Sequence, residues 1–502
     1  MRSILILISL SLVVALLCAS LPQSPTVHGD TDALIAQLDS SVPKWLAHYR
    51  IPGVVISLVV DSQVVWTQAY GLADKASGAP MKVDSVLQAS SISKTTAAWG
   101  ILKLVQAGRL DLDAPIEKYL THFRLHDSVY DKNQVTARRL LSHNAGLNVI
   151  RYNGYLPDER LPSLDESLVE WEGQGLGVRI IRQPGTGFNY SDTNYCLLQL
   201  AVEGITGEGF PEYMQREVLD PLGMTDSAYT WTPSLRSRTV TGYDARGEAW
   251  PTFQFSELAT AGLYTTAPQL ALFLTAAMPG PHGEPVGRGL LPPEVIAEMT
   301  SPQVEIRGSD RYIYAQAYGW GYFVETLSTG EAAFSHMGGN EGHRSNIAAV
   351  PSKRSGMAVL TNSDLGHELF ADILTTWTTW LGVGPLMVAN TIQVARRIIL
   401  GLCGFMDTLA LGFFLMLAGA LRSGRRCLGL GTGRKPRLWR ALGAAALVLG
   451  ILAYWLFGDY IMQADMPSIA TPLALSITWA GLVGLLALFA PRCDPNPSTY
   501  EN

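Results

Sequence analysis

Three long apolar runs follow one another near the C-terminus. They are IILGLCGFMDTLALGFFLMLAGAL at 398–421, ALGAAALVLGILAYWLFG at 441–458 and TPLALSITWAGLVGLLALFA at 471–490. Each run is about as long as a helix that crosses the hydrocarbon core of a bilayer. The sequence therefore predicts an all-α region of three transmembrane helices within residues 396–490, followed by a short tail at 491–502.

Residues 1–20 form an apolar segment of a different kind. Arg2 precedes an apolar run at 4–17, and small residues follow that run. This layout is typical of a cleaved secretory signal peptide. An uncleaved signal anchor and a lipidated Cys18 are the alternatives, and the bulky Leu17 before Cys18 favours simple cleavage.

The loops between the apolar runs predict an orientation. Seven Lys and Arg residues lie at 422–440, whereas the next loop carries Asp459 and Asp465 and no positive charge. Basic loops are retained in the cytoplasm. We therefore expect the basic loop and the C-terminal tail inside the cell, and the domain at 28–385 outside, attached to an integral membrane region. The pair Arg396 and Arg397, on the outer flank of the first run, counts against this orientation.

The net charge and the cysteine content exclude several classes of protein. A formal net charge of -6 gives no electrostatic reason to expect nucleic acid binding. Cys196 is the only cysteine between the signal segment and residue 400, so an exported domain would hold no internal disulfide. His122 and His126 have a spacing that metal ligands use on a helix, but no third ligand is near, so we expect a solvated face and no metal. Asp407 lies in the first apolar run, where a functional role and a hydrogen bond to a neighbouring helix are both open.

The exported domain has strand patterns at both ends and helical patterns between them. Strand-like segments at 53–60 and 63–71 flank Asp61 and Ser62, which predicts a tight hairpin. Further strand-like segments, and one helical segment after them, lie near the other end, at 319–326, 345–351, 356–362 and 367–381. The sequence therefore predicts an α+β domain, with a sheet made from both ends and a helical insertion between them.

The segment LQASSISKTTAAWGILKLVQAG, at 87–108, places serines ahead of a lysine and an amphipathic helix. Ser91 and Lys94 are three residues apart, so a helix presents them on the same face, where the lysine can act on the serine proton. The alternative is that the serines only cap the helix. The spacing alone does not decide, because Ser41-Val-Pro-Lys44 is a second match in the same domain.

Further segments occur in a fixed order over roughly residues 45–382. They are IPGVVISLVV, ASSISK, LDAPIEKYL, VTARRLLSHNAGL, PGTGFNYSDTNYCLLQLAVEGITG, PLGMTDS and SHMGGNEGHRSN. In combination they resemble the serine β-lactamase and penicillin-binding protein superfamily, in its class C β-lactamase, DD-peptidase and esterase-like branch. The resemblance implies a β-lactamase/transpeptidase-like antiparallel sheet flanked by helices. It also implies that Ser91 is the nucleophile and that Ser41 lies in an ordinary N-terminal helix.

The resemblance assigns a second catalytic element to Tyr190-Ser191-Asp192, at the place of the family's Tyr-x-Asn. Tyr190 then shares the serine proton with Lys94. Asp192 replaces an amide donor by a carboxylate acceptor, and it could pair with Lys94 and raise its pKa. Whether Lys94 or Tyr190 is the general base is therefore open.

The third element is His336-Met337-Gly338, where other members carry Lys-Thr-Gly. Gly338 is expected to bind substrate together with Asp192 and His336, because a glycine suits a strand that a substrate backbone must approach closely. The resemblance implies that the N–H groups of Ser91 and Gly339 form the oxyanion hole. Since a histidine of ordinary pKa is mostly neutral at pH 7, His336 offers a substrate carboxylate less than lysine does, which favours peptides or esters over penicillins. Arg344 could supply that charge, or could simply be solvated.

We thus predict a membrane-tethered, extracytoplasmic serine hydrolase that forms an acyl-enzyme on peptide, β-lactam or ester carbonyls. Its partners are a small-molecule or peptide substrate and the membrane, with no metal and no organic cofactor. His143 is expected to pack beside the site rather than act as a base. The alternative is a penicillin- or peptide-binding sensory protein that signals through the tail, which Asp407 favours and the lack of a cytoplasmic output domain opposes. The sequence indicates no oligomeric state.

Overall fold

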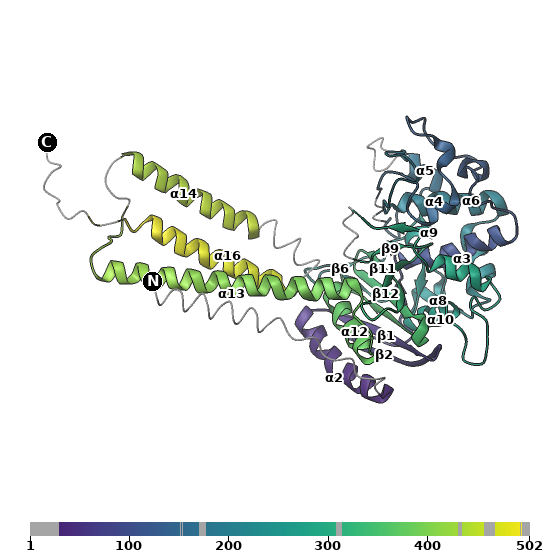
Figure 1. Cartoon of the computed structure of the whole chain (residues 1–502), viewed down its shortest axis with the longest axis horizontal. Coiled ribbons are helices and arrows are strands. Elements are labelled where there is room, and N and C mark those ends of the chain that lie inside the picture. Colours follow the sequence, from purple (N-terminus) through teal and green to yellow (C-terminus); the bar gives the residue numbers. More distant parts are fainter. Residues whose placement is uncertain are drawn as a thin grey trace. The chain divides into compact units, whose positions relative to one another are not determined.

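The computed structural model describes residues 30–150, 152, 154–169, 177–307, 314–429, 434–455, 467–491 and 493. It divides into two units, of which the larger ends at Thr391 and the smaller begins at Ile392 (Figure 1). The predicted signal peptide at 1–20 lies outside the described residues. Of the predicted tail at 491–502, the structure describes only Pro491 and Cys493.

A nine-stranded antiparallel sheet organises the larger unit. The strand order is β3-β2-β1-β13-β12-β11-β10-β9-β8. The strands are β1 (Gly53–Val60), β2 (Gln63–Asp74), β3 (Ala79–Pro80), β8 (Val304–Glu305), β9 (Ala317–Tyr318), β10 (Phe323–Thr326), β11 (Ala332–Asn340), β12 (His343–Val350) and β13 (Ser355–Thr361). β1 lies directly beside β13, with Val54 opposite Thr361. The predicted sheet made from both ends of the domain is therefore confirmed.

The sequence of β1 is apolar throughout because both faces of this strand are buried. Val55 and Val59 belong to the same core cluster as Phe273 of α10 (Ala267–Ala276). The alternate residues, such as Ile56, are also fully buried. On that second side α2 (Thr31–Tyr49) and α12 (Gly366–Trp380) pack against each other and against strands of the sheet (Figure 1). A strand covered on both faces reads as a continuous apolar run.

The tight turn between β1 and β2 has the expected position. Asp61 and Ser62 both have positive φ, at 50° and 59°. Two consecutive left-handed residues are what a two-residue hairpin turn requires. The predicted hairpin is therefore confirmed.

The helical insertion lies between β3 and β8. Its helices are α3 (Ile92–Gln106), α4 (Ala137–Leu141), α5 (Leu164–Val169), α6 (Asp192–Thr206), α7 (Phe210–Met214), α8 (Pro233–Arg236), α9 (Leu258–Ala261), α10 and α11 (Pro293–Met299). One expectation for α3 is wrong. The sequence predicted an amphipathic helix, but every residue from Ile92 to Leu102 is buried. The helix crosses the interior of the domain, so its polar residues need partners inside the protein.

The smaller unit contains the rest of α13 (Met387–Arg422), together with α14 (Arg434–Ala453) and α16 (Pro467–Leu488). By length and composition, two described helices could cross a membrane, Met387–Arg422 and Ser468–Leu488. The predicted three-helix bundle is thus not confirmed, and residues 456–458 of the second predicted span lie outside the described residues.

Polar contacts hold the helices of the smaller unit together. The Ser476 hydroxyl of α16 donates a hydrogen bond of 2.9 Å to Asp407 Oδ2 of α13. This confirms the interpretation of Asp407 as the partner of a neighbouring helix. A disulfide joins Cys427 and Cys493. The predicted orientation places both cysteines in the cytoplasm, where thiols are kept reduced. The disulfide therefore argues against that orientation. The orientation stays a prediction.

A buried glutamate holds the start of α13, within the larger unit. Glu325 Oε2 of β10 accepts a hydrogen bond of 2.8 Å from the backbone N–H of Met387. The Glu325 side chain is only 8% exposed, and its burial raises its pKa to about 7. Around neutral pH the fold thus holds a proton that an exposed glutamate would have released.

This burial predicts a stability that decreases as pH rises. Because the folded-state pKa of Glu325 lies above the unfolded value of 4.5, the folded state binds the proton more tightly between these values, and its stability falls from pH 4.5 to about pH 7. Glu325→Gln keeps an acceptor oxygen but carries no charge. We expect the wild type to lose on the order of 3 kcal/mol relative to this variant between pH 4.5 and pH 8. Urea unfolding of the full-length protein in detergent, followed by near-UV circular dichroism, measures the difference.

The matched control is Glu294→Gln, which changes an exposed glutamate of α11. Its pH profile should run parallel to that of the wild type. A Glu325→Gln profile that also runs parallel to the wild type would contradict the prediction.

Candidate active site

Ser91 occupies the N-cap position of α3, but its side chain caps nothing. Its backbone is already helical, with φ -64° and ψ -8°, and its hydroxyl makes no hydrogen bond to the first turn. The preceding residue, Ser90, has φ 53°, a left-handed conformation that is uncommon for residues other than glycine. The alternative that Ser91 is only a capping serine is therefore wrong.

Instead, the Ser91 hydroxyl faces Lys94. Lys94 Nζ lies 3.1 Å from Ser91 Oγ and donates to it. The Lys94 side chain is fully buried. Its Nζ also contacts Asp192 Oδ1 at 2.7 Å, the Thr260 carbonyl at 3.0 Å and the Thr260 hydroxyl at 2.8 Å. These four oxygens come from Ser91, from α6 and from α9, and Tyr190 is a further hydrogen-bond partner of the ammonium.

These neighbours control the charge of Lys94. Burial alone lowers the pKa of Lys94, but the charges of Asp192 and Tyr190 and their hydrogen bonds outweigh burial and hold the pKa above its ordinary value. The predicted pairing of Asp192 with Lys94, and its effect on the pKa, is confirmed. At neutral pH the resting site contains an ammonium that donates to the serine oxygen.

Tyr190 lies two residues before the start of α6, and its ring is close to the same ammonium. Lys94 Nζ is 5.2 Å from the centre of the tyrosine ring. The ring packs 4.2 Å from the ring of His143 and stacks on Phe323 with an interplanar angle of 7°. The sequence placed Tyr190 with Lys94, and the structure brings the two together.

His143 packs against Tyr190 and contacts the residues that follow it. It has φ 55° and is fully buried. Its Nδ1 accepts a hydrogen bond from the Ser191 N–H at 3.4 Å and lies 2.7 Å from Asn194 Nδ2. A nitrogen that accepts from N–H donors carries no proton itself. These contacts fit the expected packing role of His143 and give no hydrogen bond to Ser91.

β11 passes very close to the segment that leads to Ser91, and this explains the glycine at position 338. A Cβ atom at this position would lie 2.3 Å from the Ala89 carbonyl oxygen and 2.3 Å from Ser345 Oγ. Both obstacles are rigidly held, because Ser345 Oγ itself donates to that carbonyl at 2.7 Å. Among the described residues, none accepts a hydrogen bond from the Ser91 N–H. The oxyanion hole of Ser91 and Gly339 stays a prediction, and the vacant Ser91 donor is compatible with it.

His336 is buried within the protein. Its Nε2 lies 3.0 Å from the Tyr318 hydroxyl, and its Nδ1 lies 2.8 Å from the Met337 carbonyl oxygen. A carbonyl can only accept, so Nδ1 carries the proton, and a neutral ring then accepts from Tyr318 through Nε2. Both nitrogens are thereby engaged with protein groups. The role of His336 in substrate binding stays a prediction.

Arg344, on β12, is engaged with another protein group. Its guanidinium lies 2.8 Å from Asp364 Oδ1 and donates to the carbonyl oxygens of Asn340 and His343. Its side chain is 19% exposed. The positive charge proposed for a substrate carboxylate is thus compensated by Asp364.

Other sequence motifs lie apart from this site. Ser41 and Lys44 are inside α2, and Lys44 is exposed. His122 and His126 are exposed, as expected. Among the described residues, no group of His, Cys, Asp and Glu side chains could hold a metal ion.

Thr260 is a member of this site that the sequence did not predict. Its hydroxyl accepts from Lys94 and donates to Asp192 Oδ1 at 2.9 Å, so it joins the two charged groups. Thr260 lies in α9, 166 residues after Lys94, in a segment that has no local motif. Only the packing of α9 against α3 and α6 brings it to the site.

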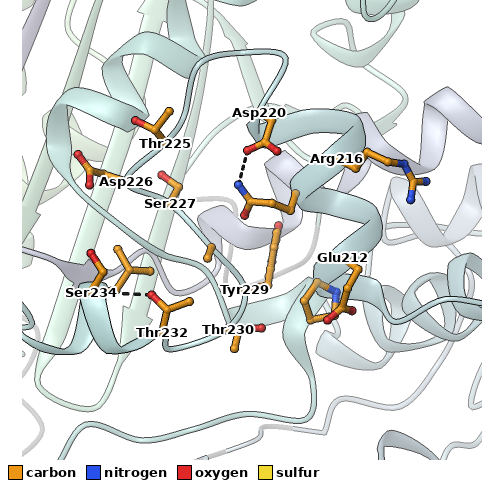
Figure 2. A pocket seen from close by; sticks show the side chains of 14 residues that line it. Glu212, Arg216, Asp220, Thr225, Asp226, Ser227, Tyr229, Thr230, Thr232 and Ser234 are labelled. Carbon is orange, nitrogen blue, oxygen red and sulfur yellow. Dashed lines mark hydrogen bonds between the residues drawn. The ribbon is translucent and has the colours of Figure 1, made fainter.

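A separate cavity of about 630 Å³ is lined by residues between Pro211 and Leu235. Figure 2 shows hydroxyl and carboxylate side chains around it, including Thr230, Asp226 and Glu212. None of the predicted site residues lines this cavity. Tyr229, in its wall, donates to the Ser93 carbonyl at 3.0 Å and so contacts the helix of the nucleophile from behind.

The fold and this site define a class of protein, which comparison with known proteins makes explicit. A family model described as Beta-lactamase matches residues 31–375, well over half of the chain. The chain therefore belongs to the Beta-lactamase family. The predicted resemblance and the predicted sheet flanked by helices are confirmed.

Comparisons of sequence and of structure each identify individual relatives. Protein flp of Staphylococcus aureus is 23% identical over 465 residues, which cover 90% of this chain and 89% of that protein. Esterase EstB of Burkholderia gladioli is 30% identical over 211 residues, covering 40% of this chain and 53% of EstB. The octameric penicillin-binding protein homologue from Pyrococcus abyssi superposes with a TM-score of 0.59 at 25% identity, over 70% of this chain and 78% of that chain. The D-amino acid amidase from Ochrobactrum anthropi shares the fold, with a TM-score of 0.56 at 22% identity over 72% of this chain and 99% of that one.

The close approach at β11 predicts that a single methyl group at Gly338 disrupts the domain. Gly338→Ala forces Cβ against a backbone oxygen, and overpacking of this kind costs about 1–3 kcal/mol or more. Gly339→Ala is the control on the same strand, since the atoms nearest to its Cβ belong to the Arg344 side chain, at 3.2 Å or more, and not to the backbone. Thermal unfolding should give a markedly lower Tm for Gly338→Ala than for Gly339→Ala. Equal Tm values would contradict the close approach.

The position of Thr260 predicts a positioning role for its hydroxyl. Thr260→Val removes the bonds of the hydroxyl to Lys94 and Asp192, keeps the carbonyl that also accepts from Lys94, and leaves the shape nearly unchanged, whereas Thr260→Ser keeps the hydroxyl. We expect the valine variant to react with a fluorophosphonate at Ser91 about tenfold more slowly, the loss corresponding to about one hydrogen bond. The serine variant should stay close to the wild type. A serine variant as slow as the valine variant would contradict the role of the hydroxyl.

Proposed function

We propose that this protein is a membrane-tethered, extracytoplasmic serine hydrolase that acts on peptide, ester or related carbonyls through an acyl-enzyme on Ser91. The observation that carries the proposal is the 3.1 Å contact between Ser91 Oγ and the buried Lys94 ammonium. Burying a charge costs free energy unless the charge has polar partners, and here the partners of the Lys94 ammonium include the Ser91 hydroxyl. Buried titratable groups of this kind cluster at functional sites.

The proton of Ser91 passes to the groups that surround Lys94. An ammonium that already donates to Ser91 Oγ cannot accept the serine proton, so Lys94 serves as the positive charge that stabilises negative charge developing on Ser91 Oγ, and the hydroxyl of Tyr190 relays the proton. Ser91 Oγ attacks the carbonyl carbon while its proton passes to the Tyr190 oxygen, and Tyr190 gives its own hydroxyl proton to the leaving group. A water molecule, activated by the same groups, hydrolyses the acyl-enzyme and releases Ser91.

The developing oxyanion needs hydrogen-bond donors opposite the nucleophile. We place the Ser91 N–H as the first donor, and its lack of an acceptor among the described residues supports this role. We place the Gly339 N–H as the second donor, because Gly338 lets β11 pass directly beside the segment that leads to Ser91. Donors held in place before the reaction cost no reorganisation in the transition state.

The sensory alternative loses part of its support. Its main argument was Asp407, and the bond from Ser476 gives this carboxylate a structural partner. The export and tethering of the hydrolase rest on the signal-like segment and on the two described helices that are long enough to cross a membrane. Fluorescent penicillin distinguishes the two functions, because a sensor keeps the acyl group and a hydrolase releases it.

The proposal predicts that covalent labelling depends on one serine. The full-length protein in detergent should form a fluorophosphonate adduct of one equivalent by intact mass. Ser91→Ala should abolish the adduct, whereas Ser41→Ala, the other serine with a lysine three residues on, should label as fast as the wild type. An adduct that persists in Ser91→Ala, or no adduct at all, would refute the proposed nucleophile.

A further inference from the structure

The two oxygens of Asp192 have different surroundings. Oδ1 contacts Lys94 Nζ at 2.7 Å and accepts from the Thr260 hydroxyl at 2.9 Å. Among the described residues, none donates to Oδ2. The Asp192 side chain is 23% exposed, whereas Lys94 is completely buried. The carboxylate therefore covers the ammonium and presents its second oxygen to solvent. It is linked to Ser91 Oγ through Lys94, which contacts both groups.

This oxygen can only accept hydrogen bonds. An asparagine in its place would offer an NH₂ group and could bind a substrate carbonyl, but an ionised aspartate repels carbonyl and carboxylate oxygens. A ligand group that faces Asp192 must therefore be a donor. Ammonium and amide N–H groups are the donors that an amino-acid derivative carries close to its reacting carbonyl.

The cations near the site are already compensated. Lys94 is paired with Asp192, and Arg344 lies 2.8 Å from Asp364. His336 has protein groups at both of its ring nitrogens. Of the basic site residues predicted from the sequence, none is left to bind a carboxylate. A substrate with a free carboxylate beside its reacting carbonyl would meet the negative side of the Asp192 pair without compensation.

We infer that the substrate is an ester or amide whose acyl group bears an amine, held by a charge-assisted hydrogen bond from its ammonium to Asp192 Oδ2, and that acyl groups bearing a carboxylate are rejected. This inference rests on the proposed function and names the substrate class of the same site. Hydrogen bonds to charged groups correspond to a preference on the order of tenfold to a hundredfold in kcat/KM over an acyl group that lacks the donor.

Matched esters test the inference on the full-length protein in detergent. Two kinds of 4-nitrophenyl ester carry an ammonium: the two enantiomers of the 2-aminopropanoate ester, and the achiral 3-aminopropanoate ester. Their counterparts, the 2-methylpropanoate and the butanoate ester respectively, have a methyl group of similar size in its place. The succinyl ester carries a carboxylate. Ser91→Ala supplies the background rate. We expect at least one amine-bearing ester to exceed its methyl counterpart by tenfold or more in kcat/KM, and the succinyl ester to be slower than butanoate.

The variant Asp192→Asn separates recognition from chemistry. Its weaker pairing with Lys94 slows all esters, but that loss cancels in the ratio of an amine-bearing ester to its methyl counterpart. We expect this ratio to fall about tenfold and the succinyl ester to gain relative to butanoate. Asp61→Asn, at the exposed β1–β2 turn, is the matched control and should leave both ratios unchanged.

The outcomes also separate this inference from the proposed function. If the neutral esters are cleaved in a manner that depends on Ser91, but the amine-bearing esters show no advantage, or keep it in Asp192→Asn, the inference is overturned and the hydrolase stands. If no ester is cleaved and no fluorophosphonate labels Ser91, the proposed function fails first, and the inference fails with it.

Discussion

The buried ammonium of Lys94 is the constraint around which the domain is built. An uncompensated charge in a protein interior is unstable by several kcal/mol, so the fold must deliver its partners wherever the lysine lies. Those partners are Asp192 from α6 and both oxygens of Thr260 from α9. The mutual packing of α3, α6 and α9 is therefore tied to the satisfaction of one charged atom. Removing any single partner leaves the charge and its remaining neighbours unbalanced.

The same ammonium connects the fold to the chemistry. Its partners hold the pKa of Lys94 above the ordinary value, which keeps the charge in place while Ser91 faces it. Tyr190 lies against the ammonium and is itself fixed by the rings of His143 and Phe323. A site with this arrangement is already charged and oriented before a substrate enters. In the proposed reaction, such preorganisation would lower the barrier without reorganisation of the site.

Much of this could be predicted from the sequence, because local patterns carry it. The apolar run of β1 and the turn at Asp61 predicted the hairpin, and the spacing of Ser91 and Lys94, with Tyr190 from the resemblance, predicted the group of residues that the structure brings together. The family resemblance was needed to choose Ser91 over Ser41, since both have a lysine three residues on. Only the structure showed that the Ser91 side chain caps nothing.

The rest could not be predicted, because it depends on long-range packing. Thr260 reaches Lys94 across 166 residues, and no motif links the two. The partners of His336 and Arg344, which decide whether these residues can bind a substrate, come from Tyr318 and Asp364. The strand that carries Gly338 was placed by the resemblance alone, and the reason for its glycine is a clash with a distant backbone oxygen. In each case the chemistry of a residue depends on a neighbour that the sequence does not identify.

The C-terminal unit requires more than tethering to explain it. The match to Protein flp covers 90% of this chain, so it extends well past residue 375, where the family model ends. Within the unit, Ser476 bonds to Asp407, and the indole N–H of Trp455 donates to Thr478 at 2.9 Å. Polar bonds between helices fix which faces meet, and in an apolar surrounding they are favoured because the alternative is an unsatisfied group. A simple anchor needs one helix and no such pairing, so these contacts describe a folded unit with a defined arrangement of its own.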